Sequence, residues 1–293
     1  MEIFVPDYYE KFKCIADQCK HTCCLGWEID IDEASFARYM AEEGEMGARL
    51  RESIFTNGEG AHFRLSEGDR CPFLNDKNLC DLILHFGEDA LCRICRDHPR
   101  YRNFFESRTE VGLGLSCEAA ARLILEGEKR PEMVALGGAA PEETEEEATF
   151  FAFRESLLDM VFTDKPLRKC MADIAEKFGL SIPEPSFDFY TSLSVLHDSW
   201  TEKLSLLRAP MGENQETHMA AKRLFAYFVY RHLADLYFEG REAAGVAFCL
   251  YAVKTVLNLS ADMADFLDTA RRFSEEIEYD TDNVQRIINM LEI

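Results

Sequence analysis

Cysteine is the residue type whose number and spacing could do chemistry, because thiolates are strong ligands for zinc and for iron–sulfur clusters. The chain has 293 residues and 11 cysteines, and most of the cysteines fall in the first 117 residues. These are Cys14, Cys19, Cys23, Cys24, Cys71, Cys80, Cys92, Cys95 and Cys117. The other two, Cys170 and Cys249, lie among apolar, helix-forming residues, where we expect buried and inert thiols.

The first cysteines are close enough along the chain to share a metal. Cys14, Cys19 and Cys23 are three or four residues apart, so their thiolates can converge if the backbone turns. Cys24 follows Cys23 directly, and neighbouring side chains diverge along a regular helix or strand. The adjacent pair therefore suggests a multi-iron cluster, or two metal sites that each take one thiolate.

The later cysteines contain one CxxC unit, formed by Cys92 and Cys95, which is half of a typical zinc or iron–sulfur site. With seven further cysteines nearby, this unit predicts a metal or cluster site whose thiolate ligands all come from the nine cysteines of the first 117 residues. The alternative is that these cysteines are buried or redox-active thiols. Zinc and iron both remain open: only one CxxC pair is present, and Arg93 and Arg96 beside it suit a negatively charged cluster. Histidines of the same region could replace a thiolate, although a structural role is the simpler interpretation for each: His21, His62, His85 and His98.

Charge and hydropathy narrow the class of protein. The 54 acidic and 32 basic side chains give a net charge of -22, which disfavours nucleic-acid binding and favours a basic partner. The N-terminus shows no secretory signal, and the apolar stretch 243–259 is short for a membrane span and contains Lys254. We therefore expect a cytoplasmic protein without membrane contact, in which structural disulfides are rare.

Helical patterns dominate the elements that must position these residues, so the sequence predicts a mainly α protein. We expect a cysteine-rich metal- or cluster-binding domain with irregular loops at residues 1–128, an acidic linker at 129–147, and a helical domain at 148–293. In the first domain, residues 62–65 and 111–115 could pair as short strands. In the last domain, the expected helices cover 150–161, 167–178, 187–207, 225–236, 241–259, 261–277 and 281–291.

Several motifs together resemble the flagellin lysine-N-methylase family. The first runs from Cys14 to Cys24, continues through Trp27 and ends in an Ile-Asp-Ile-Asp stretch at 29–32; the others cover residues 71–80 and 92–100. The last two are also similar to a broader family of zinc- or iron-chelating cysteine-cluster proteins. The resemblance covers residues 1–125 well and the rest more weakly, around 227–231.

The resemblance implies an enzyme that transfers a methyl group from S-adenosylmethionine to lysines of flagellin or another lysine-bearing protein, with a cysteine-bound 4Fe-4S cluster. The chain departs from two familiar S-adenosylmethionine motifs. Cys19 and Cys23 start a CxxxCxxC pattern, but position 26 is glycine, and the lone GxG at 112–114 lacks a Rossmann context.

Two functions follow as hypotheses. The first is a protein-lysine N-methyltransferase, with Asp97 and His98 beside the CxxC unit as the first candidates for a general base. The alternative is a non-catalytic zinc- or iron-binding protein that acts structurally or as a redox sensor.

Overall fold

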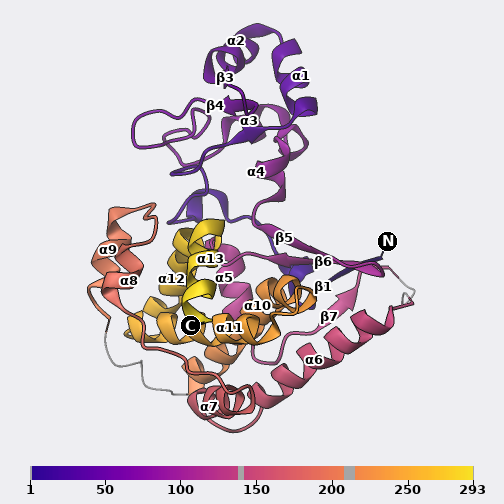
Figure 1. The fold of residues 1–293 in the computed structure, drawn as a ribbon. Coiled ribbons are helices and arrows are strands. Elements are labelled where there is room, and N and C mark those ends of the chain that lie inside the picture. Colours follow the sequence, from indigo (N-terminus) through magenta and orange to yellow (C-terminus); the bar gives the residue numbers. More distant parts are fainter. Residues whose placement is uncertain (1, 138–141, 208–214, 293) are drawn as a thin grey trace. The chain divides into compact units, whose positions relative to one another are not determined.

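The computed structural model describes residues 2–137, 142–207 and 215–292 (Figure 1). In this part the chain is mainly α, with α-helices α1 to α13 and two small sheets. It divides into two compact units, each described by itself below. Residues 13–99 form the cysteine unit, and residues 1–12 together with 100–293 form the helical unit.

The cysteine unit is built from short elements around a three-stranded antiparallel sheet of order β2-β4-β3. Its elements are η2 (Ala16–Gln18), β2 (Asp30–Ile31), α1 (Glu33–Ala41), α2 (Gly44–Ser53), β3 (Ile54–Thr56), β4 (Ala61–Phe63), α3 (Asp81–Phe86), η3 (Glu88–Ala90) and α4 (Arg93–Asp97). Asp32 caps α1 by accepting a hydrogen bond from the Ser35 amide, and Gly44 begins α2 with a φ of 75°.

The core of the cysteine unit is small and includes thiols. Nine apolar side chains and two cysteines are buried together: Ile29, Ile31, Tyr39, Leu50, Ile54, Phe63, Phe73, Leu74, Leu82, Cys71 and Cys92. The Tyr39 hydroxyl donates a hydrogen bond to the Ala90 carbonyl at 2.7 Å, so this buried polar group is satisfied.

The helical unit contains a four-stranded sheet of order β5-β6-β1-β7. Its strands are β1 (Glu2–Pro6), β5 (Arg100–Phe104), β6 (Arg108–Leu113) and β7 (Met133–Ala135), and the turn η1 (Tyr9–Lys11) follows β1. β1 runs parallel to β6 and antiparallel to β7. The chain therefore leaves this sheet after β1, forms the cysteine unit, and returns at β5.

Long helices supply the core of the helical unit. They are α5 (Glu118–Leu125), α6 (Glu145–Val161), α7 (Leu167–Lys177), α8 (Phe187–Thr191), α9 (Asp198–Leu204), α10 (Gln215–Phe238), α11 (Glu242–Leu259), α12 (Met263–Phe273), the π-helix η4 (Ser274–Glu278) and α13 (Thr281–Leu291). Among the described helices, α11 alone has the length and apolar composition of a membrane span, and 83% of it is buried within the protein. Its burial confirms the prediction of a core helix.

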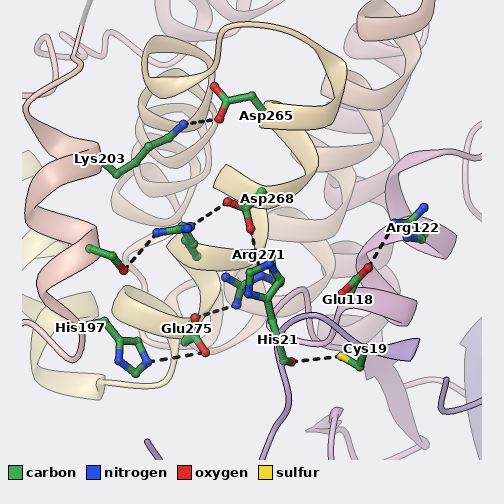
Figure 2. A network of polar contacts seen from close by, with 12 residues as sticks. Cys19, His21, Glu118, Arg122, His197, Lys203, Asp265, Asp268, Arg271 and Glu275 are labelled. Carbon is green, nitrogen blue, oxygen red and sulfur yellow. Dashed lines mark hydrogen bonds and ion pairs between the residues drawn. The ribbon is translucent and has the colours of Figure 1, made fainter. Parts of the chain in front are cut away.

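Buried and half-buried ion pairs join the helices of this unit. Lys203 of α9 pairs with Asp265 of α12, and Arg271 contacts Glu275 at 2.7 Å (Figure 2). Deeper in the unit, Glu278 is fully buried and contacts Arg231 at 3.3 Å and His232 at 2.5 Å. Burial alone would raise the pKa of Glu278, but the Arg231 guanidinium and the hydrogen bond with His232 outweigh it and lower the pKa to about 2.

The structure changes two expectations about the strands and helices. Residues 62–65 and 111–115 do not pair: β4 pairs with β2 and β3, whereas β6 pairs with β5 and β1. The helix expected over 187–207 is two short helices, α8 and α9, separated by residues 192–197. Both differences arise from tertiary partners, which local patterns do not reveal.

The described part of the predicted linker is structured. β7 pairs with β1, and Thr144 and Glu147 form a capping box that begins α6. Residues 138–141 of that linker lie outside the described residues. The compact units also divide at residues 12 and 99, whereas the predicted boundary fell at 128, because β1, β5 and β6 join the sheet of the helical unit.

Candidate metal centre

Five cysteines gather around the core of the cysteine unit. Cys71 and Cys92 are buried within it, and Cys24, Cys80 and Cys95 pack against it. These five, named the thiol cluster below, come from three separate stretches of the sequence, so their proximity depends on three local backbone arrangements.

The first arrangement brings Cys24 to Cys71. Leu25 and Arg70 form an antiparallel bridge, and the Cys71 amide donates a hydrogen bond to the Cys24 carbonyl at 2.9 Å. Gly26 lies beside the bridge with a φ of 75°, a conformation that favours glycine. The motif that follows the adjacent cysteines therefore folds back onto the second group.

A tight turn then joins Cys71 to Cys80. The Asn75 side chain accepts hydrogen bonds from the Lys77 and Leu79 amides, at 2.9 and 3.1 Å, which is typical of an Asx turn. Leu74 bridges to Cys80, so the two ends of the loop meet. Arg49 braces the loop by donating to the Pro72 carbonyl.

The third arrangement places the CxxC unit at the start of α4. Cys92 is the N-terminal residue before α4, and Cys95 lies within the helix. Asp32, which caps α1, also accepts a hydrogen bond from the Arg93 amide at 2.7 Å. This bond is the largest cause that lowers the pKa of Asp32, to about 2, so one carboxylate fixes the starts of two helices.

The thiols of the cluster alter one another's pKa. A hydrogen bond from Cys95, opposed by burial, lowers the pKa of Cys92, and the same contact raises the pKa of Cys95. Burial raises the pKa of Cys71 to about 12, with further contributions from Cys24, Cys80 and Cys92. A hydrogen bond from Cys23 lowers the pKa of Cys24 to about 7. These effects act through space, so they are consistent with five thiols gathered in one region and do not require their sulfur atoms to touch.

The donor set fits a thiolate-bound metal or cluster in its chemistry, because soft sulfur ligands select zinc and iron–sulfur clusters. Within residues 2–137, 142–207 and 215–292, no three side chains of His, Cys, Asp or Glu are arranged as a metal-binding group. The thiols are therefore gathered at one core but do not converge on one point.

The other predicted ligands lie outside the thiol cluster. Cys14 and Cys23 are exposed, and the Cys19 thiol donates to the His21 carbonyl at 3.2 Å (Figure 2). Cys117 precedes α5 in the helical unit and packs against that unit's core. As expected for inert thiols, the last two cysteines of the chain are fully buried in the same core.

The adjacent cysteines lie in different surroundings. Cys23 is exposed, whereas Cys24 packs on the core. Their thiols nevertheless share a hydrogen bond, because the chain turns at this point instead of continuing as a strand or helix.

The candidate bases and histidines lie in different surroundings. Asp97 ends α4, and His98 follows it, so both stay next to the CxxC unit and are partly buried. His62 is buried and contacts Asp30 and Asn57, at 2.9 and 3.1 Å, which is a structural role. Spacing did not identify Asp32 as the residue that holds the CxxC helix, because its role depends on a contact 61 residues away.

Comparison with known proteins gives a small set of related sequences. The chain is 25% identical over 138 residues to the flagellar biosynthetic protein FliU of Salmonella muenchen, which covers 45% of this chain and 80% of FliU. It is 24% identical over 162 residues to the lysine-N-methylases of Salmonella typhimurium and Salmonella choleraesuis, which covers 53% of this chain. The match spans only 40% of the length of those two proteins.

No family model matches the chain, and no solved structure matches it. The two lysine-N-methylases agree with the resemblance carried by the cysteine motifs. The sequence is therefore related to the flagellin lysine-N-methylase family.

Proposed function

We propose that this protein is a cytoplasmic protein-lysine N-methyltransferase, which uses S-adenosylmethionine and a 4Fe-4S cluster held by its cysteines. The observation that supports it best is the thiol cluster, which assembles three sequence motifs of a chain related to proteins named lysine-N-methylase. The protein substrate would be flagellin or another protein with exposed lysines, which suits a net charge of -22.

The thiol cluster offers more sulfur ligands than one cluster needs. A 4Fe-4S cluster takes four cysteine thiolates. Two stretches of the chain each supply one buried and one partly buried thiol: Cys71 with Cys80, and Cys92 with Cys95. Cys24 would be either a fifth neighbour or a replacement. When bound, the cluster would supply a site that holds or activates the methyl donor.

The transfer itself requires a neutral lysine amine. The amine nitrogen forms a bond to the methyl carbon as the carbon–sulfur bond of the donor breaks, and the lysine proton passes to a base. S-Adenosylhomocysteine leaves as the second product. Asp97 and His98 are the candidate bases, because they lie two and three residues after Cys95 of the CxxC unit.

The test is a paired measurement on protein purified and reconstituted without oxygen. Iron and sulfide content are determined together with the visible absorbance, and methyl transfer from labelled S-adenosylmethionine to flagellin is followed by mass spectrometry of lysine peptides. We expect several iron atoms per chain, and methylated lysine only when iron is present. Replacing Cys92 and Cys95 with serine should abolish both, whereas Cys170→Ala should change neither, because Cys170 is buried in the helical unit.

A zinc- or iron-binding protein without enzymatic activity is the second candidate. The short overlap with the lysine-N-methylases favours it, since the chain matches only 40% of their length. Stoichiometric zinc with no iron and no methyl transfer would establish this alternative and exclude the methyltransferase.

A further inference from the structure

A pocket of about 360 Å³ opens in the helical unit, which is within the usual size for a small-molecule site. Its walls come from α7, from α11 and from the segment between α7 and α8. Most of the lining is apolar: Met171, Ala172, Ala175, Ile182, Leu250 and Leu257. The thiol cluster contributes nothing to this pocket, so it is a separate candidate site.

Four polar side chains complete the lining, and they carry both signs of charge. They are Arg168, Glu184, Lys254 and Asn258. Lys254 and Asn258 are one turn apart on α11 and both contact the carboxylate of Glu184: the Lys254 ammonium lies 2.8 Å from Oε1, and the Asn258 amide donates to Oε2 at 3.3 Å. Arg168 stands on the exposed rim.

The side-chain oxygen of Asn258 could accept a hydrogen bond that no described part of the protein supplies. Asn258 is only 4% exposed, and its Oδ1 atom is buried without a hydrogen-bond partner among the described residues. An unsatisfied buried acceptor costs about 1–3 kcal/mol, so most such atoms in native proteins have a donor. A ligand with an N–H group would supply that donor.

We propose that the pocket binds the α-amino-acid head group of a small metabolite with an apolar side chain. The ammonium would donate to Asn258 Oδ1 and Glu184, and the carboxylate would accept from Arg168 and Lys254. The apolar side chain would lie against the α7 and α11 walls. A zwitterion would exchange the Lys254–Glu184 pair for two pairs with the ligand, whereas a simple amine or a simple acid would break that pair and leave one of its charges without a partner.

S-Adenosylmethionine carries such a head group, and this part of the proposal rests on the proposed function. A free amino acid such as methionine carries the same group. The two sources share the chemistry of recognition, so the experiment compares them directly.

The test is calorimetric titration of the full chain with L-methionine, S-adenosylmethionine, and the decarboxylated and deaminated analogues of methionine. We expect saturable binding of at least one amino acid and much weaker binding of both analogues. Asn258→Ala and Lys254→Met should each weaken binding by about tenfold, the usual effect of losing one hydrogen bond to a charged group. Lys169→Met is the control, because this exposed lysine lies on the same helix outside the pocket.

Arg168→Gln keeps the proposal testable if a buried variant fails to fold, because an exposed rim residue is replaced without disturbing the core. Binding of methionine without binding of S-adenosylmethionine would uphold the amino-acid site and remove its link to methyl transfer. No saturable binding, equal binding of the two analogues, or unchanged binding in all three pocket variants would overturn the proposal. Methyl transfer and iron content are measured separately, so failure here is distinct from failure of the proposed function.

Discussion

The two units stabilise themselves by different means. In the helical unit, α6, α10 and α11 have 17, 24 and 18 residues, and their faces bury a large aromatic and aliphatic core. In the cysteine unit, α1 to α4 have only 5 to 10 residues, and thiols form part of a much smaller core. Short helices gain little from propensity, and a small core buries little surface. The comparison indicates that the helical unit has the larger apolar core, and we expect the cysteine unit to need additional stability from metal–thiolate bonds.

Metal removal should have the largest effect on stability, and it should unfold one unit while the other stays folded. We expect chelation to unfold residues 13–99 while most helicity of the other unit survives, because metal–thiolate bonds contribute directly to folding. Each unit contains one tryptophan, Trp27 in the cysteine unit and Trp200 in the helical unit, so single-tryptophan variants report on them separately. Loss of the Trp27 signal with an intact Trp200 signal is the expected result, and unchanged amide exchange in residues 13–99 after verified metal removal would refute it.

The second largest effect should come from removing the charged partner of the buried Glu278, which should destabilise the helical unit. Arg231→Met leaves the buried Glu278 carboxylate without its guanidinium partner, which should cost about 3–5 kcal/mol of unfolding free energy. The double variant Arg231→Met with Glu278→Gln should recover much of this loss, because no uncompensated charge remains. Urea unfolding followed at Trp200 measures both, and a single-variant loss below about 1 kcal/mol would show that the network adds little.

A buried carboxyl should give the helical unit a pH-dependent stability. Burial raises the pKa of Glu276 to about 7, although the Leu196 and His197 amides donate to it. The folded pKa exceeds the ordinary value near 4.3, so the folded state binds more protons and its stability falls as pH rises through this window. Between pH 5 and 8 the loss should be roughly 2–3 kcal/mol.

The matched comparison for this effect is Glu276→Gln against Glu202→Gln, an exposed residue of α9. The first variant should lose the pH dependence, and the second should keep it. If all three proteins show the same slope of unfolding free energy against pH, Glu276 is not its source.

The smallest expected effect distinguishes the adjacent cysteines. Cys24→Ser should lower metal content more than Cys23→Ser, because Cys24 packs on the thiol cluster and Cys23 is exposed. Metal analysis of both variants, with Cys249→Ala as a buried-thiol control, measures this. Full metal content in both variants would mean that the pair does not coordinate the metal.

The sequence was sufficient for the parts of the fold that depend on local patterns. The helix over residues 241–259 was expected from its apolar run and is observed at 242–259, and the last helix is observed as predicted at 281–291. The sheet of the helical unit was not predicted, because β1 pairs with residues more than one hundred positions away. Pairing of that kind depends on the whole fold and leaves no local periodicity.

The candidate site shows the same limit. The number and grouping of the cysteines predicted a thiol-rich site, and five of the nine lie around one core. The separate location of Cys117 could not be read from spacing, because residue 100 begins the return to the other unit. The pocket beside Asn258 gave no sequence signal either, since its lining is an ordinary apolar helix face until the contacts are known.

The position of β1 sets an order of events during protein synthesis. Ribosomes deliver about 5–20 residues per second, so β1 waits roughly 5 to 20 s before β6, its parallel partner at residues 108–113, has been made. All eight cysteines between residues 14 and 95 leave the ribosome within that interval. The cysteine unit is therefore synthesised completely before β6, and its thiols can bind metal before β1 and β6 pair in the sheet of the helical unit. A shortage of metal in the growing cell should then act on the nascent chain rather than on the finished protein.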